Sequence, residues 1–111
     1  MPEQYERTRR HPRAKPPAGM LVAWQAGTHR AVSFLESIAL GGLFIRTANP
    51  PPVRSLVKVL IELPTGDLNA RAIVRRVSPS LGMGVEFIAM TQESRAMLRQ
   101  TLRPLLPGET I

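Results

Sequence analysis

The chain of 111 residues has the length of one domain, which excludes two separate cores of ordinary size. Its formal charge is +7, it has no cysteine, and 43% of its residues are hydrophobic. These values exclude a disulfide scaffold and a thiolate metal site. No apolar run is long enough for a membrane span, and charged residues stand where a secretory signal needs an apolar segment. We therefore expect a cytoplasmic protein.

Residues 1–18 are polar, basic and proline-bearing, with neither a helical nor a strand period. Proline fixes φ and holds the preceding residue in extended conformations, so a flexible, extended arm is predicted. The arm carries Arg9-Arg10-His11-Pro12-Arg13, and thirteen of the fifteen basic residues in the chain are arginine. Guanidinium groups suit phosphate and planar rings. The arm is thus either a site for a planar anion or a solvated basic tail, and a GC-rich genome would also favour arginine.

Six short strands are predicted between residues 19 and 90. Alternating apolar side chains indicate the first at 20–25 and the second at 28–35, joined by a turn at Ala26-Gly27. The paired glycines Gly41 and Gly42 form a corner before a third strand at 43–47. Prolines at 50–52 require a loop, and further strands are predicted at 57–63, 68–77 and 82–88.

Thr91 is a favourable N-cap for a helix that runs to about Arg103, where Pro104 ends or kinks it. Six evenly spaced strands followed by one amphipathic helix predict a mainly β protein: a six-stranded antiparallel β-barrel with a C-terminal α-helix. The barrel and helix should occupy residues 19–106, leaving residues 107–111 as a tail.

Catalytic and metal-binding patterns are missing from the sequence. His11 and His29 are the two histidines, and neither has a second histidine or a carboxylate at ligand spacing. The eight carboxylates are scattered, and strand residues such as Glu62 and Glu86 are expected to be solvated or salt-bridged. No nucleophile or phosphate-loop motif is present. We therefore expect a protein that is not an enzyme and has no catalytic cofactor.

Three segments resemble the PilZ domain family of bacterial β-barrel modules that typically bind cyclic di-GMP. Arg9 to Arg13 is similar to the RxxxR arm of that family. Ser37 to Ile45 lies where the family has its (D/N)xSxxG corner. Gly82 to Phe87, followed by the capped helix, resembles the last strand and the C-terminal helix. The resemblance extends from about Arg7 to Leu105 and implies the barrel fold, second-messenger signalling, and control of motility, adhesion or biofilm exopolysaccharide.

The resemblance also implies a ligand site. The arm arginines Arg9 and Arg13 would pair with the phosphates of cyclic di-GMP and stack on its guanines, with Arg10 as an additional contact. At the corner, the positions that correspond to the family motif are those of Ser37, Ala39, Gly41 and Gly42.

The corner departs from the family pattern at two positions. Ser37 stands in place of Asp or Asn, and Ala39 stands in place of serine and has no hydroxyl. Each lost hydrogen bond would cost about 0.5–1.5 kcal/mol, so two would weaken binding roughly ten- to a hundredfold. The glycines are also what a barrel needs to turn a corner, so they indicate the fold more than the ligand.

Three functions remain open at this point. The first is a cyclic di-GMP receptor whose arm becomes ordered on binding and relays the signal to a separate effector protein. The second is a PilZ-like adaptor that binds cyclic di-GMP weakly or not at all and acts through protein–protein contacts. The third, nonspecific nucleic-acid binding, is disfavoured because aromatic residues are only 5% of the chain and form no basic stripe.

Overall fold

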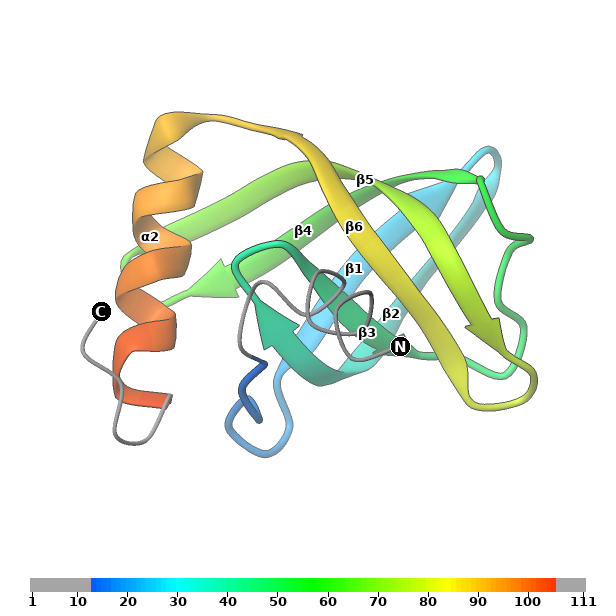
Figure 1. Ribbon diagram of the computed structural model, residues 1–111, viewed down its shortest axis with the longest axis horizontal. Helices are drawn as coiled ribbons and strands as arrows, with labels where there is room; N and C mark the ends of the chain where they lie inside the picture. The colour runs from blue at the N-terminus through cyan, green and yellow to red at the C-terminus, as the bar shows by residue number, and fades with distance from the viewer. Residues whose placement is uncertain (1–12, 106–111) are drawn as a thin grey trace, which may run out of the picture.

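The computed structural model describes residues 13–105, which form one closed β-barrel with a helix at its end (Figure 1). Its elements are β1 (Leu21–Ala26), β2 (His29–Ala39), β3 (Gly42–Arg46), β4 (Leu56–Leu63), β5 (Gly66–Ser78), β6 (Gly82–Met90), α2 (Gln92–Leu102) and a 3-10 turn, η1 (Arg103–Leu105). Every pairing is antiparallel, in the order β1-β2-β3-β6-β5-β4 around the ring. The predicted fold class is confirmed.

Aliphatic side chains fill the barrel because each strand turns alternate residues inward. The predicted alternation in β4 is confirmed, since Val57, Val59, Ile61 and Leu63 are buried whereas Lys58 and Glu62 are exposed. Trp24 on β1 is also buried, and its indole nitrogen donates to the hydroxyl of Ser33 over 3.0 Å. The barrel therefore has a packed interior, and any ligand must bind on its outer side or at its ends.

Strand β2 is longer than the sequence pattern predicts. The prediction ended it at Leu35, but β2 continues to Ala39, and only Leu40 and Gly41 form the turn into β3. A β-bulge between Leu35 and Ser37 explains the difference, because an inserted residue breaks the period of two while pairing with β3 continues. Ser37 and Ala39 consequently lie on a strand beside β3.

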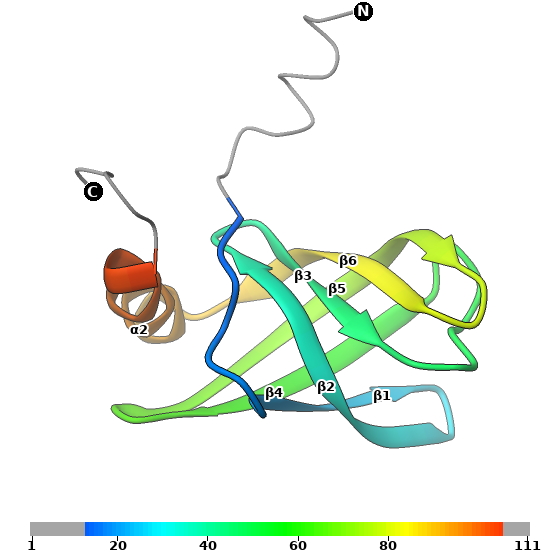
Figure 2. The same ribbon diagram turned by 90° about the horizontal axis from the view of Figure 1, so that it is seen from below.

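The helix α2 covers one end of the barrel, where the β2–β3 and β4–β5 turns also lie (Figures 1 and 2). Its buried side chains Leu98 and Leu102 join the core of the barrel. The helix begins as predicted, because the Thr91 hydroxyl accepts a hydrogen bond from the Ser94 backbone N–H over 3.0 Å. It passes into η1 at Arg103, so Pro104 lies just beyond the helix, as expected. No helix within residues 13–105 is long and apolar enough to cross a membrane.

Removal of the N-cap should loosen this end of the barrel. Thr91→Ala leaves the Ser94 N–H without its acceptor and is expected to lower the free energy of unfolding by about 1 kcal/mol, as measured by urea denaturation. Gln100→Ala, at an exposed position of the same helix, is the control and should change stability by less than about 0.5 kcal/mol. Equal effects of the two substitutions would contradict the capping role.

Candidate functional site

The segment before β1 is fixed to β2 by a pair of backbone hydrogen bonds. The Ala14 N–H donates to the Ile38 carbonyl over 2.8 Å, and the Ile38 N–H donates to the Ala14 carbonyl over 3.0 Å. Ala14 is only 5% exposed and belongs to the core cluster. Figure 2 shows this segment, in dark blue, passing the end of β2. The bridge brings the last residue of the arginine motif to the outer side of β2.

Arg13 and Ser37 meet directly on that outer side. One terminal nitrogen of the Arg13 guanidinium, Nη1, donates a hydrogen bond to the Ser37 hydroxyl over 3.0 Å. Arg13 is exposed and Ser37 is half-buried. The two residues are 24 positions apart in the chain, so the contact joins the predicted arm to the predicted corner. Arg9 and Arg10, the other predicted arm residues, lie outside the described residues.

Gly42 has a structural role at the corner. A Cβ atom at this position would lie 2.1 Å from the Val85 carbonyl oxygen of β6, and Gly42 does not adopt a positive φ. Only glycine therefore allows β3 to approach β6 this closely. The neighbouring Gly41 carbonyl accepts a hydrogen bond from the Phe87 N–H over 2.9 Å, which holds the turn against β6. Both glycines thus tie the corner to the barrel.

Ala39 lies on the same side of β2 as Ser37, because it is two residues further along the strand. It pairs with Gly42 across the turn and is only 3% exposed. A serine at this position would place its hydroxyl in a buried environment, where a hydrogen-bond partner is needed. The structure therefore brings together Arg13, Ser37, Ala39, Gly41 and Gly42 around one turn.

Phe44 and Arg76 extend this surface away from Ser37. Ser37 pairs with Phe44 on β3, and Phe44 pairs with Gly84 on β6, which in turn pairs with Arg76 on β5. The Arg76 guanidinium carbon lies 5.8 Å from the centre of the Phe44 ring, a cation–π contact. These register partners form a row across four strands, in which the Phe44 ring and the Arg76 guanidinium provide a flat surface beside the Ser37 hydroxyl.

Neither Phe44 nor Arg76 was predicted from the sequence to be a site residue. Gly82 on β6 makes room for Phe44, because a Cβ there would lie 2.7 Å from the ring, whereas a Cβ at Gly84 would be in ordinary contact with Arg76 Nε at 3.4 Å. The Gly82-x-Gly84 spacing was a usable signal, because small residues two apart on a strand leave one face open to large neighbours.

Two exposed ion pairs border the row. Arg46 Nε lies 3.5 Å from a Glu36 carboxylate oxygen, and Arg75 Nε lies 2.5 Å from a Glu86 oxygen. The salt-bridged role expected for Glu86 is thereby confirmed. Exposed pairs of this kind contribute little to stability, about 0–1 kcal/mol. Among the described residues, Arg13 lies against Ser37, and Arg76 lies against Phe44, the strand neighbour of Ser37. Residues 13–105 contain no cluster of three side chains suited to a metal ion.

Comparison with known proteins gives a consistent family. The family model for the PilZ domain matches residues 7–103. The PilZ domain of YcgR from Escherichia coli, solved with c-di-GMP, is similar in structure, with a TM-score of 0.71 and 14% identity over 87% of this chain and 90% of that one. MotI (DgrA), an inhibitor of motility from Bacillus subtilis, gives a TM-score of 0.73 and 20% identity over 92% of this chain.

PlzA from Borreliella burgdorferi, in complex with c-di-GMP, gives a TM-score of 0.68 and 9% identity over 89% of this chain and 43% of that one. The present chain spans about half the length of MotI, of which 53% is covered. At these identities the likeness to each solved structure is a likeness of fold. A search of curated protein sequences found no match.

Proposed function

The chain belongs to the PilZ domain family, and on this premise we propose that it is a cyclic di-GMP receptor, a binding module without catalytic activity. The ligand carries two phosphates and two guanine rings, so a site for it needs guanidinium groups and a flat surface. In this proposal Arg13 and Arg9 pair with phosphate and stack on guanine, and Arg10 adds a contact. Solved PilZ relatives that contain c-di-GMP support the choice of ligand.

The hydrogen bond between Arg13 and Ser37 is the observation that carries this proposal. It places an exposed guanidinium of the arm against the corner, at the edge of the surface made by Phe44 and Arg76. A charge-assisted, bidentate contact to phosphate is stronger than one hydrogen bond to a hydroxyl. A bound ligand would therefore take over the Arg13 guanidinium, and the arm would change its position on β2.

The change in the arm is the proposed signal. The position of residues 1–18 would differ between the free and bound protein, and a separate effector protein would recognise one of the two arrangements. The effector is defined only by its ability to distinguish the free arm from the bound arm. The cellular process that is regulated depends on which protein the effector is. The proposal places the protein in the cytoplasm, where cyclic di-GMP would reach it.

A second function is favoured by the two departures at the corner, Ser37 and Ala39. Ala39 offers no hydroxyl, and Ser37 offers neither the carboxylate nor the amide of the family motif. A PilZ-fold adaptor with this corner would bind cyclic di-GMP weakly or not at all and would act through contacts with another protein.

Isothermal titration with cyclic di-GMP separates the two functions. The receptor proposal predicts saturable binding of cyclic di-GMP and none of cyclic di-AMP, because the adenine edge lacks the exocyclic oxygen and ring N–H of guanine. If neither nucleotide binds at concentrations of about 100 μM, a limit corresponding to about 5.5 kcal/mol of binding free energy, the adaptor function replaces the receptor function.

Restoration of the corner tests the cost of its two departures. Ser37→Asp with Ala39→Ser supplies the carboxylate and the hydroxyl of the family motif, and it should tighten cyclic di-GMP binding about tenfold or more, measured by the same titration. Thr65→Asp adds one carboxylate at the exposed β4–β5 turn and is the control for charge. Unchanged affinity in the double variant would show that these two positions do not limit binding.

A further inference from the structure

A second surface lies on the outer side of the barrel over β2, β1, β4 and β5. Strand register places two rows of side chains next to each other there, and together they form what we call the basic–apolar face. The apolar members are Leu21, Ala23, Val32, Phe34 and Leu60, and the basic members are Arg30, Lys58 and Arg71. The face begins on β2, the strand that also carries Ser37 and Ala39, and extends away from the corner through β1 to β4 and β5; β4 is three places from β3 in the ring of six strands.

The apolar row is exposed to an unusual degree. Leu21 is 46% exposed, Val32 is 66% exposed and Phe34 is 56% exposed. The alternation through Val32 and Phe34 that predicts β2 in the sequence therefore belongs to the outer side, whereas Leu35 is buried. An antiparallel strand with one wet face normally carries polar residues there. A contiguous exposed apolar surface of this kind indicates an interaction site.

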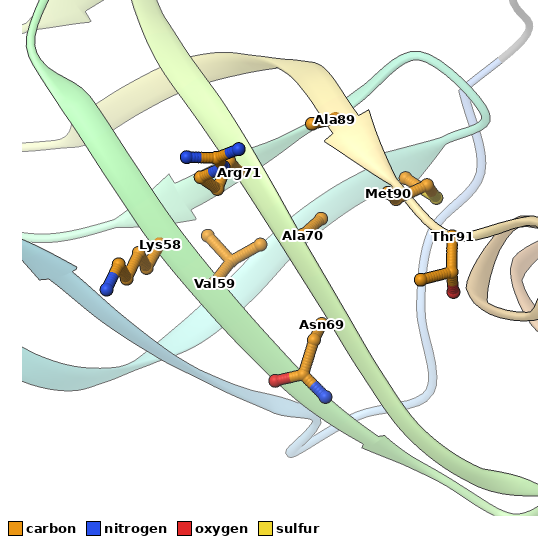
Figure 3. A pocket seen from close by; sticks show the side chains of 8 residues that line it. All are labelled: Lys58, Val59, Asn69, Ala70, Arg71, Ala89, Met90 and Thr91. Carbon is orange, nitrogen blue, oxygen red and sulfur yellow. The ribbon is translucent and has the colours of Figure 1, made fainter.

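Within the described part of the chain, the basic row has no acidic partner. The ion pairs within residues 13–105 are Arg46–Glu36 and Arg75–Glu86, and neither involves Arg30, Lys58 or Arg71. Lys58 and Arg71 stand directly opposite each other on β4 and β5, and Figure 3 shows them side by side on the two strands. Like charges in this position destabilise a strand pair. An acidic group bound between them would remove the repulsion.

Two shallow, open depressions of about 390 and 420 Å³ adjoin on this face and share Lys58, Val59 and Asn69. The apolar residues Ala23, Val32 and Leu60 line the second of them. An exposed apolar lining of this kind suits a protein partner better than a nucleic-acid backbone. The barrel is closed, so a partner cannot add a strand to these six and must bind through side chains.

We propose that the basic–apolar face binds a segment of a partner protein that has acidic side chains along one edge and apolar side chains along the other. The acidic edge lies over Arg30, Lys58 and Arg71. The opposite orientation is disfavoured, because the acidic pair Glu62 and Asp67 lies beyond the apolar row. This inference rests on the proposed function only in that a relay needs a partner, and it does not require cyclic di-GMP to be the ligand.

A displayed peptide library tests the proposal without knowledge of the partner. Random peptides of about 12 residues, which span about 40 Å when extended, are selected on the immobilised full-length chain. The same selection uses Arg30→Glu/Lys58→Glu/Arg71→Glu. Arg54→Glu/Arg95→Glu/Arg99→Glu is the matched control, because it makes the same charge change at exposed arginines elsewhere. Enriched peptides are then synthesised and their affinities measured by fluorescence anisotropy.

The expected peptides combine acidic and apolar residues. Their affinity for the face variant should be about 30-fold weaker than for the native chain, and their affinity for the control variant should be within about threefold of that for the native chain. Binding of cyclic di-GMP should be the same in all three proteins, which separates this result from failure of the receptor proposal. Absence of acidic, apolar peptides, or equal binding to both variants, would overturn the inference. So would binding of duplex DNA or phosphatidylglycerol vesicles that depends on Arg30, Lys58 and Arg71 while peptides fail to bind.

Discussion

Arg13→Ala should weaken cyclic di-GMP binding about ten- to a hundredfold, as measured by isothermal titration. The substitution removes a charge-assisted contact to phosphate, which is worth about 1.5–3 kcal/mol. In the free protein the same guanidinium donates to Ser37, which keeps it beside the corner before the ligand arrives. Arg9→Ala together with Arg13→Ala should abolish detectable heat, because both principal arm contacts are lost.

Two further variants distinguish a specific contact from a general loss of charge. Arg13→Lys keeps the positive charge but loses the planar fork, and it should still weaken binding by about tenfold. Arg95→Ala removes one positive charge from the exposed face of α2 and should leave binding unchanged. Equal losses in Arg13→Ala and Arg95→Ala would mean that net charge, and not the arm, determines affinity.

Gly42→Ala should lower the free energy of unfolding by about 3 kcal/mol in urea denaturation. The added methyl group would lie 2.1 Å from the Val85 carbonyl oxygen, so β3 must move away from β6 and their backbone hydrogen bonds must lengthen. The loss would be a large part of the roughly 5–15 kcal/mol that stabilises an ordinary domain.

Gly84→Ala is the matched control, because it is also a glycine inside the β3–β6–β5 part of the sheet. The atom nearest to a Cβ added at Gly84 belongs to the flexible Arg76 side chain and lies 3.4 Å away, which is an ordinary contact distance. We expect a change of less than about 1 kcal/mol. If Gly42→Ala were as mild as Gly84→Ala, the close approach of β3 to β6 would not be the reason for glycine at the corner.

The barrel was predictable because it separates an apolar interior from a wet exterior. The alternation from Val57 to Leu63 has one meaning in such a fold, and the helix has local signals at both ends, in Thr91 and Pro104. The predicted end of β2 was wrong because a bulge changes the period of two. Nothing in the local residues between Leu35 and Ser37 indicates where the extra residue will be inserted.

The candidate site was only partly accessible from the sequence. The resemblance pointed to Arg13 and Ser37, but their contact depends on the Ala14–Ile38 bridge, which is a long-range pairing. Phe44 and Arg76 meet across β6 through the register of three strands, which alternation cannot give. The basic–apolar face was missed because an apolar alternation does not say which side of the strand faces water.

The measurement that tests the central claim most directly is an amide NMR titration of the isotopically labelled chain with cyclic di-GMP. The account predicts saturable shifts at Arg13, Ser37 and Phe44 and on β6 near Gly84, while the amides of Lys58 and Arg71 across the barrel stay in place. Shifts centred on Lys58 and Arg71 with none at Arg13 and Ser37, or no shifts at all, would contradict it.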